Sequence, residues 1–72
     1  MTTPAWLHIW QLLDEAWEAH DPAPTVRELV TACGLSSTSV ALYAIKKLER
    51  EQIIQRDPGK ARSIRLLRRF EG

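Results

Sequence analysis

The chain has 72 residues, of which 44% are hydrophobic, and a formal net charge of +1. This length predicts one small domain over residues 1–72 with a limited core. No run of about 18 apolar residues is present, which argues against a membrane span. The N-terminus lacks the charged and apolar regions of a signal peptide, which favours a cytoplasmic protein.

The charges are unevenly distributed along the chain. Residues 1–35 carry one basic side chain against five acidic ones, whereas residues 36–72 carry nine basic against four acidic. Such asymmetry is typical of a protein with one face that meets a polyanion, although ordinary clustering on a solvated surface also produces it. Here the basic half coincides with a predicted helix and hairpin, which favours the first interpretation.

Residues 4–20 are predicted to form the first helix, with Thr3 as its N-cap and Pro4 in its first turn. The segment 20–24 (HDPAP) ends it, because proline cannot continue a helix. Apolar residues recur at three- and four-residue spacing on one stripe of this helix: Trp6, Ile9, Trp10, Leu13, Ala16 and Trp17.

Residues 25–33 are predicted to form the second helix. Thr25 and Glu28 have the spacing of a capping box. Gly34 follows the apolar run and suits the left-handed position that ends a helix. A short turn containing glycine is therefore expected before the next helix.

The third helix is predicted over residues 37–52, with Ser36 as its N-cap. At about 100° per residue, one stripe of it should face the core: Ala41, Ala44, Ile45 and Leu48. Other side chains point away from that stripe: Ser39, Leu42, Tyr43, Lys46 and Arg50.

Residues 53–66 are predicted to form a two-stranded wing around the turn residues 57–60. Alternation in its second strand places Ile64 and Leu66 toward the core and Arg65 toward solvent. The last five residues show no period, so we expect that end to fray and its arginines to be solvated tail charges. The predicted fold is mainly α with a small β-hairpin: a winged helix-turn-helix made of a three-helix bundle and a two-stranded antiparallel wing.

Four segments, taken in order and at their spacing, resemble the N-terminal DNA-binding domain of LexA-type SOS repressors. They are residues 24–29 (PTVREL), 34–37 (GLSS), 48–50 (LER) and 54–60 (IQRDPGK). The similarity covers about residues 4–67 and needs no gap within 24–66. The resemblance implies a three-helix bundle with a wing that binds palindromic operators as a dimer.

The chain departs from that family in two respects. Full repressors continue into a self-cleaving domain with a serine–lysine dyad, whereas this chain stops before one. We therefore expect a fragment or a truncated relative, for example a phage-encoded one, that does not process itself. The second departure is that Val40, Leu42 and Tyr43 stand where polar or charged residues are expected. The family's operator sequences are therefore not carried over.

By the resemblance, the N-terminal part of the third helix faces bases in the major groove. The predicted base-contacting residues are Ser37, Ser39, Val40, Leu42 and Tyr43. The two serines donate and accept, while Val40 and Leu42 suit the methyl groups of thymine. Two alternatives remain open for these apolar side chains: packing against the first helix or the wing, and a protein interface.

Phosphate contacts are expected from the second helix, the third helix and the wing. The predicted residues are Arg27, Thr38, Lys46, Lys47, Lys60 and Arg62. For each basic group the alternative is a solvated side chain.

Other residues that carry chemistry elsewhere are interpreted structurally here. We expect Trp10 and Trp17 in the core and Trp6 partly exposed, rather than all three stacked on single-stranded bases. Cys33 is the only cysteine, so it forms no intrachain disulfide or cysteine zinc site, and we expect a buried thiol. His8 and His20 lack a third ligand of suitable spacing, so no metal site is expected.

The leading hypothesis is a sequence-specific regulator that binds double-stranded DNA, most simply a repressor that occupies an operator. A weak or DNA-assisted homodimer is expected, because so small a domain leaves little surface for a strong one. The alternative is a winged-helix module that binds a protein, for example a phage product engaging a host regulator, with weak and non-specific DNA binding. Architectural or replication-linked DNA binding is a third option. No cofactor is expected, and an enzyme is not, since no serine has a plausible His or Lys partner and no Gly-rich phosphate loop exists.

Overall fold

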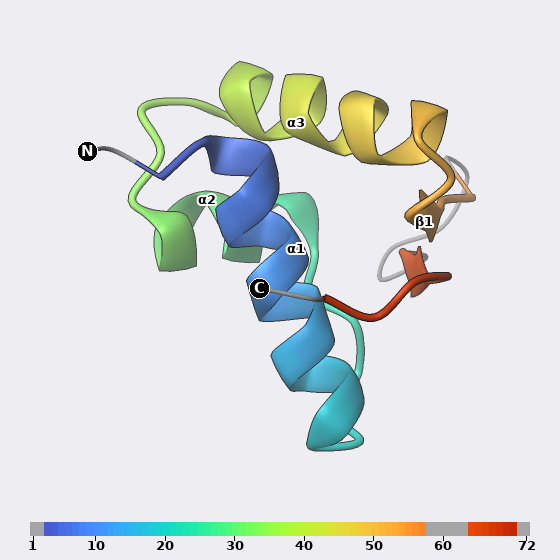
Figure 1. Ribbon diagram of the computed structural model, residues 1–72. Coiled ribbons are helices and arrows are strands. Elements are labelled where there is room, and N and C mark those ends of the chain that lie inside the picture. Colours follow the sequence, from blue (N-terminus) through green and yellow to red (C-terminus); the bar gives the residue numbers. More distant parts are fainter. Residues whose placement is uncertain (1–2, 58–63, 71–72) are drawn as a thin grey trace.

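The computed structural model describes residues 3–57 and 64–70. Its elements follow one another as three helices and a two-stranded antiparallel sheet: α1 (Ala5–Glu18), α2 (Val26–Cys33), α3 (Thr38–Arg50), β1 (Ile54–Gln55) and β2 (Arg65–Leu66). α3 passes across the N-terminal half of α1, and the sheet lies beside the C-terminal end of α3 (Figure 1). The predicted mainly helical fold with a small β-hairpin is confirmed.

α1 is shorter than the predicted helix at both ends. Pro4 is its N-cap, with φ −59° and ψ 147°, and no side chain caps it. The Pro4 carbonyl accepts hydrogen bonds from the N–H groups of Leu7 and His8, both at 3.1 Å. The prediction that Thr3 caps this helix is wrong, because the extended backbone at Pro4 makes the proline carbonyl the first acceptor of the helix.

All three helices end with one residue in the left-handed conformation: His20 (φ 59°), Gly34 (φ 63°) and Gln52 (φ 59°). In each case the next N–H donates to a carbonyl five residues back, which is the Schellman arrangement. These bonds join Asp21 to Ala16 at 2.9 Å, Leu35 to Val30 at 3.0 Å and Ile53 to Leu48 at 2.9 Å. The prediction for Gly34 is confirmed, whereas the other two ends carry side chains that disfavour this conformation.

Side-chain caps start both α2 and α3. The hydroxyl of Thr25 accepts from the N–H of Glu28 at 3.2 Å, and the Thr25 N–H donates to the Glu28 carboxylate at 2.8 Å, which confirms the capping box. At α3 the cap is Ser37, whose hydroxyl accepts from the Val40 N–H at 3.4 Å. The choice of Ser36 is therefore wrong by one residue, since the extended backbone that precedes the helix falls at Ser37.

Residues 34–37 join α2 to α3, and the direction of the chain changes by 107° between the two helices. Two helices at about 90–120° across a short turn containing glycine form a helix-turn-helix. The arrangement leaves one side of α3 against α1 and α2 and the other side outward (Figure 1). α3 is therefore placed as the second, outward helix of the motif.

The core lies where the three helices meet the sheet. It is formed by buried aliphatic side chains: Ile9, Leu13, Leu29, Ala41, Ala44, Ile45, Leu48, Ile53, Ile54 and Ile64. All four residues that α3 contributes are those of the predicted stripe. The predicted inward face of α3 is thus confirmed.

The paired strands begin at Ile54, one residue after the predicted start of the wing, and end at Leu66, its predicted end. Ile54 pairs with Leu66 and Gln55 with Arg65, in antiparallel register. Ile64 is buried, Arg65 is exposed and Leu66 packs against the core, so the predicted alternation is confirmed. Residues 58–63, which include most of the predicted turn, lie outside the described part of the chain.

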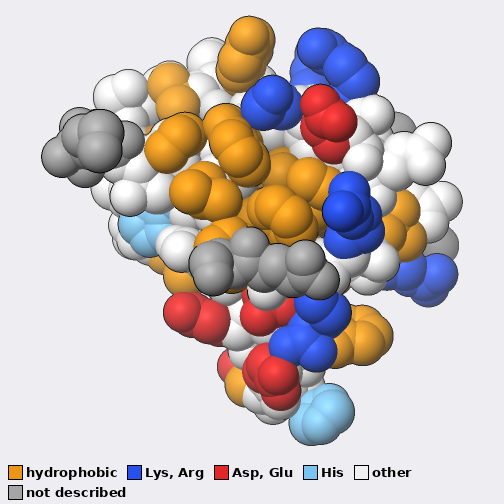
Figure 2. All heavy atoms as spheres, in the orientation of Figure 1, with side chains coloured by type: hydrophobic (Ala, Val, Ile, Leu, Met, Phe, Trp, Pro, Cys, Tyr) orange, Lys and Arg blue, Asp and Glu red, His pale blue; other side chains and the backbone are white. Residues whose placement is uncertain are grey.

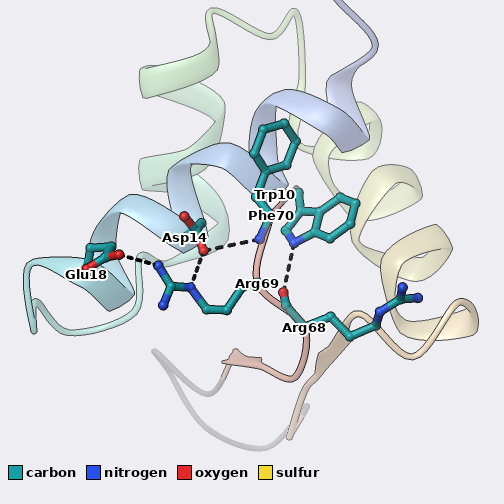
Figure 3. Close-up of polar contacts among 6 residues, drawn as sticks. All are labelled: Trp10, Asp14, Glu18, Arg68, Arg69 and Phe70. Carbon is teal, nitrogen blue, oxygen red and sulfur yellow. Dashed lines mark hydrogen bonds and ion pairs between the residues drawn. The ribbon is translucent and has the colours of Figure 1, made fainter. Parts of the chain in front are cut away.

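The C-terminal segment (residues 68–70) packs along α1. The indole N–H of Trp10 donates to the Arg68 carbonyl at 2.9 Å, and the Phe70 ring meets the Trp10 ring edge to face, with centroids 5.3 Å apart (Figure 3). Arg69 pairs with Asp14 and Glu18 of the same helix. The prediction that this segment frays is wrong for these three residues, because contacts with a helix more than fifty residues away in sequence order them.

Candidate nucleic-acid interface

The side of α3 opposite its buried stripe is open to solvent. Ser39, Tyr43, Lys46 and Arg50 are all exposed there, and Tyr43 is 78% exposed. Thr38, the first residue of α3, is exposed as well. An exposed helical face with its N-terminal turns uncovered has the dimensions to enter a major groove about 12 Å wide.

Ser37 caps α3 and keeps its hydroxyl proton for a further hydrogen bond. Its hydroxyl oxygen accepts the Val40 N–H and so caps α3. The hydroxyl proton is not used in that bond, so Ser37 can still donate to an acceptor in front of the helix. Its position is held by the helix start, which suits a residue that contacts a base.

The two aliphatic residues predicted to face bases differ in exposure. Val40 is 36% exposed and lies on the side of α3 next to α1, whereas Leu42 is half-buried. Neither belongs to the buried core or to the hydrophobic residues packed against it. Both therefore remain candidates for an apolar contact made from outside.

An open apolar groove lies between the first turns of α1 and the outer side of α3, with a volume of about 400 Å³. Besides Ala44, its lining comprises Ala5 and Trp6 of α1 and Ser39, Val40, Tyr43 and Lys47 of α3. Figure 2 shows hydrophobic side chains gathered over these elements, with lysine and arginine side chains beside them. The groove brings together three predicted base-contacting residues and one predicted phosphate-contacting residue.

The predicted phosphate-contacting residues are distributed over two helices. Lys46 is exposed, and Lys47 is half-buried with its ammonium 5.3 Å from the centre of the Trp6 ring. Arg27 is exposed in the first turn of α2. Lys60 and Arg62 lie outside the described residues.

The three tryptophans of α1 have different surroundings. Trp6 and Trp10 are half-buried and pack against the core, which confirms the partial exposure expected for Trp6. Trp17 is 54% exposed, so its predicted place in the core is wrong. The last buried residue of α1 is Leu13. Burial of this helix thus ends before Trp17.

Cys33 is half-buried and packs against the core. Burial raises the pKa of its thiol, which disfavours the thiolate at neutral pH. The environment fits a small apolar residue better than a nucleophile.

The described residues contain no group of three or more His, Cys, Asp or Glu side chains placed to hold a metal ion. In the same ranges no single helix is long and apolar enough to cross a membrane, and α2 with α3 meets that criterion only as a bent pair.

Sequence reasoning missed the acidic site on α1 that receives Arg69. The Nε of Arg69 donates to Asp14 Oδ1 at 2.5 Å, and its Nη2 donates to Glu18 Oε1 at 2.6 Å (Figure 3). The Phe70 N–H donates to the same Asp14 oxygen at 3.2 Å. The hydrogen bond from Arg69 lowers the pKa of Asp14, and both carboxylates raise the pKa of Arg69. The four-residue spacing of Asp14 and Glu18 on one helix face was the available signal.

Three helices with a 107° turn between α2 and α3, an outward α3 and an antiparallel β-hairpin define a winged helix-turn-helix. Proteins of this class use the outward helix to read DNA. A family model described as LexA DNA binding domain matches residues 2–63. The chain belongs to the LexA DNA-binding domain family.

Curated relatives named LexA repressor also match the chain. The chain is 48% identical over 44 residues to the protein from Clostridium botulinum, which covers 61% of this chain. It is 36% identical over 56 residues to that from Corynebacterium diphtheriae and 36% over 59 residues to that from Acetivibrio thermocellus, covering 78% and 82% of this chain. The matches cover 22%, 24% and 28% of those relatives' lengths, so the chain corresponds to about a quarter of each.

Proposed function

We propose that this protein is a sequence-specific repressor that binds double-stranded DNA and occupies an operator with α3 in the major groove. The observation that carries the proposal is the exposed outer face of α3 in a chain of the LexA DNA-binding domain family. That face is polar at its N-terminal end and basic toward its C-terminal end, with Lys46 and Arg50 exposed. Such an order suits base contacts from the first turns and phosphate contacts from the later ones.

The proposed base contacts divide by chemistry. Ser37 and Ser39 offer hydroxyl groups that hydrogen-bond several bases, and Tyr43 has the length to reach a base edge or a phosphate. Val40 and Leu42 would pack on thymine methyl groups. We therefore expect an operator half-site with thymines beneath these two residues.

Phosphate contacts would position the domain without selecting a sequence. The proposed residues are Arg27, Thr38, Lys46, Lys47, Lys60 and Arg62. Arg69 is not added to this set, since Asp14 and Glu18 hold its guanidinium.

One domain of this size covers a half-site, so useful affinity requires two copies on an inverted repeat. We propose a weak or DNA-assisted homodimer. Sedimentation of the protein alone should show a monomer at micromolar concentration, and a tight dimer without DNA would contradict this part of the proposal.

The proposed function is tested by selecting bound duplexes from a randomised pool at near-physiological salt and sequencing them. Enrichment of an inverted repeat with thymines in each half-site is the expected result. Enrichment should disappear with a variant carrying Ser39→Ala and Tyr43→Ala, whose replaced side chains are exposed and leave the core intact. A pool that stays unenriched with the unchanged protein would overturn sequence-specific binding.

The apolar groove favours a second candidate function, docking of a protein partner. Trp6, Val40 and Tyr43 present apolar surface there beside the proposed DNA-binding face. Under this alternative DNA binding would be weak, independent of sequence and abolished by moderate salt. The selection experiment separates the two, because only the repressor produces an enriched repeat.

A further inference from the structure

The ammonium of Lys47 lies over the indole of Trp6, 5.3 Å from the ring centroid. Trp6 belongs to the first turn of α1 and Lys47 to the C-terminal half of α3, so the contact joins two helices. A cation over the face of tryptophan is attracted by the negative face of its π-system. Both side chains are half-buried, which restricts their rotamers.

The contact leaves the charge of Lys47 available to an outside anion. Among the described residues, no carboxylate forms an ion pair with Lys47. The aromatic ring is uncharged, so the ammonium keeps its full positive charge and its hydrogen-bond donors. Lys47 also borders the groove that contains Ser39 and Tyr43, on the side of α3 proposed to face DNA.

Lys46, the neighbouring lysine, provides the contrast. It is exposed, and in the described part of the chain it has no aromatic contact. An exposed lysine loses much rotamer freedom when it binds a phosphate, whereas one already held in place loses less. The two lysines should therefore depend differently on Trp6.

We propose that Trp6 is a positioning residue of the DNA interface, which holds Lys47 so that its ammonium meets a backbone phosphate when α3 enters the major groove. The inference rests on the proposed function and adds α1, through Trp6, to the interface. Trp6 itself contributes no charge and no base contact in this arrangement. Its effect on DNA affinity passes through Lys47.

The test is a set of mutant cycles in which affinity for the selected duplex is measured. Trp6→Leu should weaken binding about three- to five-fold, the size expected for a partly exposed cation–π contact. The loss should vanish in a Lys47→Met background and persist in a Lys46→Met background. Trp6→Tyr should restore most of the affinity, since its ring also binds a cation.

Two further measurements separate the loss of the contact between Trp6 and Lys47 from a general change in the fold. The side-chain methylene protons of Lys47 should show upfield ring-current shifts in the NMR spectrum that disappear in Trp6→Leu. Trp17→Leu, which removes an exposed tryptophan from the last turn of α1, serves as the matched control and should leave affinity unchanged.

The outcomes distinguish this inference from the proposed function. Equal losses for Trp6→Leu with and without Lys47, or no loss at all, would overturn the positioning role while duplex binding stands. Failure of the unchanged protein to bind any duplex would overturn the function and this inference together.

Discussion

Arg69 and Asp14 are 55 residues apart in sequence, yet the guanidinium Nε donates to the Asp14 carboxylate at 2.5 Å. The same carboxylate oxygen accepts the backbone N–H of Phe70. Together these bonds attach the C-terminal segment to α1 (Figure 3). Two acidic residues of α1, Asp14 and Glu18, thus hold the C-terminal segment against this helix.

The pairing predicts a dependence of stability on acid. The hydrogen bond from Arg69 lowers the folded-state pKa of Asp14 below its ordinary value of 3.8. This contribution is therefore fully present above about pH 4 and is lost as pH falls through the lowered folded-state pKa. Urea unfolding between pH 7 and pH 2 should show that the free energy of unfolding falls less in acid for Asp14→Asn than for the unchanged protein. An equal fall in the free energy of unfolding at low pH in the two proteins would contradict the pairing.

Gly34 should be hard to replace for reasons of backbone conformation alone. Its φ is 63°, and a Cβ built on it would meet nothing within 4 Å. Gly34→Ala should therefore destabilise the protein by about 1–2 kcal/mol, the cost of a left-handed alanine without any clash. Chemical denaturation measures this cost, and an alanine variant as stable as the original would show that the turn relaxes.

Gln52 ends α3 in the same left-handed conformation, with φ 59°. Gln52→Gly should stabilise the protein by about 0.5–1 kcal/mol, because glycine adopts this conformation without the penalty of a Cβ. Gln52→Ala is the matched control, since it removes the polar group but keeps the Cβ, and should give no gain. A destabilised glycine variant would mean that the Gln52 side chain makes a needed contact.

Trp10 and Trp17 should respond differently to substitution although the sequence pattern treats them alike. Trp10→Phe removes the indole N–H that donates to Arg68 and should cost about 0.5–1.5 kcal/mol. Trp17 is 54% exposed, so Trp17→Ser should change the free energy of unfolding by about 0.5 kcal/mol or less. Thermal unfolding of both variants shows which one loses more stability. A larger loss of stability for the Trp17 variant would contradict the structure.

Binding to the selected duplex should depend strongly on salt. If about four phosphates are neutralised per protomer, log affinity should fall with log salt concentration with a slope of about −4. Lys46→Met should reduce the magnitude of that slope by about 0.9, whereas Arg69→Gln should leave it unchanged, because Arg69 is paired within the fold. A slope near zero for the unchanged protein would remove the electrostatic part of the proposal.

Local patterns predicted much of the fold. The capping box at Thr25, the left-handed turn at Gly34 and the buried stripe of α3 were all confirmed. These features depend on residues within a few positions of one another, because hydrogen-bond geometry and helical period require particular residue types at fixed spacings. Such spacings leave the position of an N-cap uncertain by one residue. Thr3 and Ser36 were therefore predicted as caps in place of Pro4 and Ser37.

The candidate DNA-binding surface was predicted in part. The exposure of Ser39, Tyr43 and Lys46 follows from the helical period once the buried stripe of α3 is known. The half-burial of Leu42 and the contact of Lys47 with Trp6 do not follow from it, because both depend on what packs beside α3. Their roles in DNA binding stay predictions for the experiments above.

By itself the sequence determined the three helices, the hairpin, the inward stripe of α3 and the family, because these arise from local propensity, periodicity and motif spacing. Tertiary structure alone decided that Trp17 stays exposed and that residues 68–70 pack on α1. It also decided that Trp6 meets Lys47 across two helices. These contacts join residues far apart in the chain, and their energies depend on how helices cross, which no local pattern records.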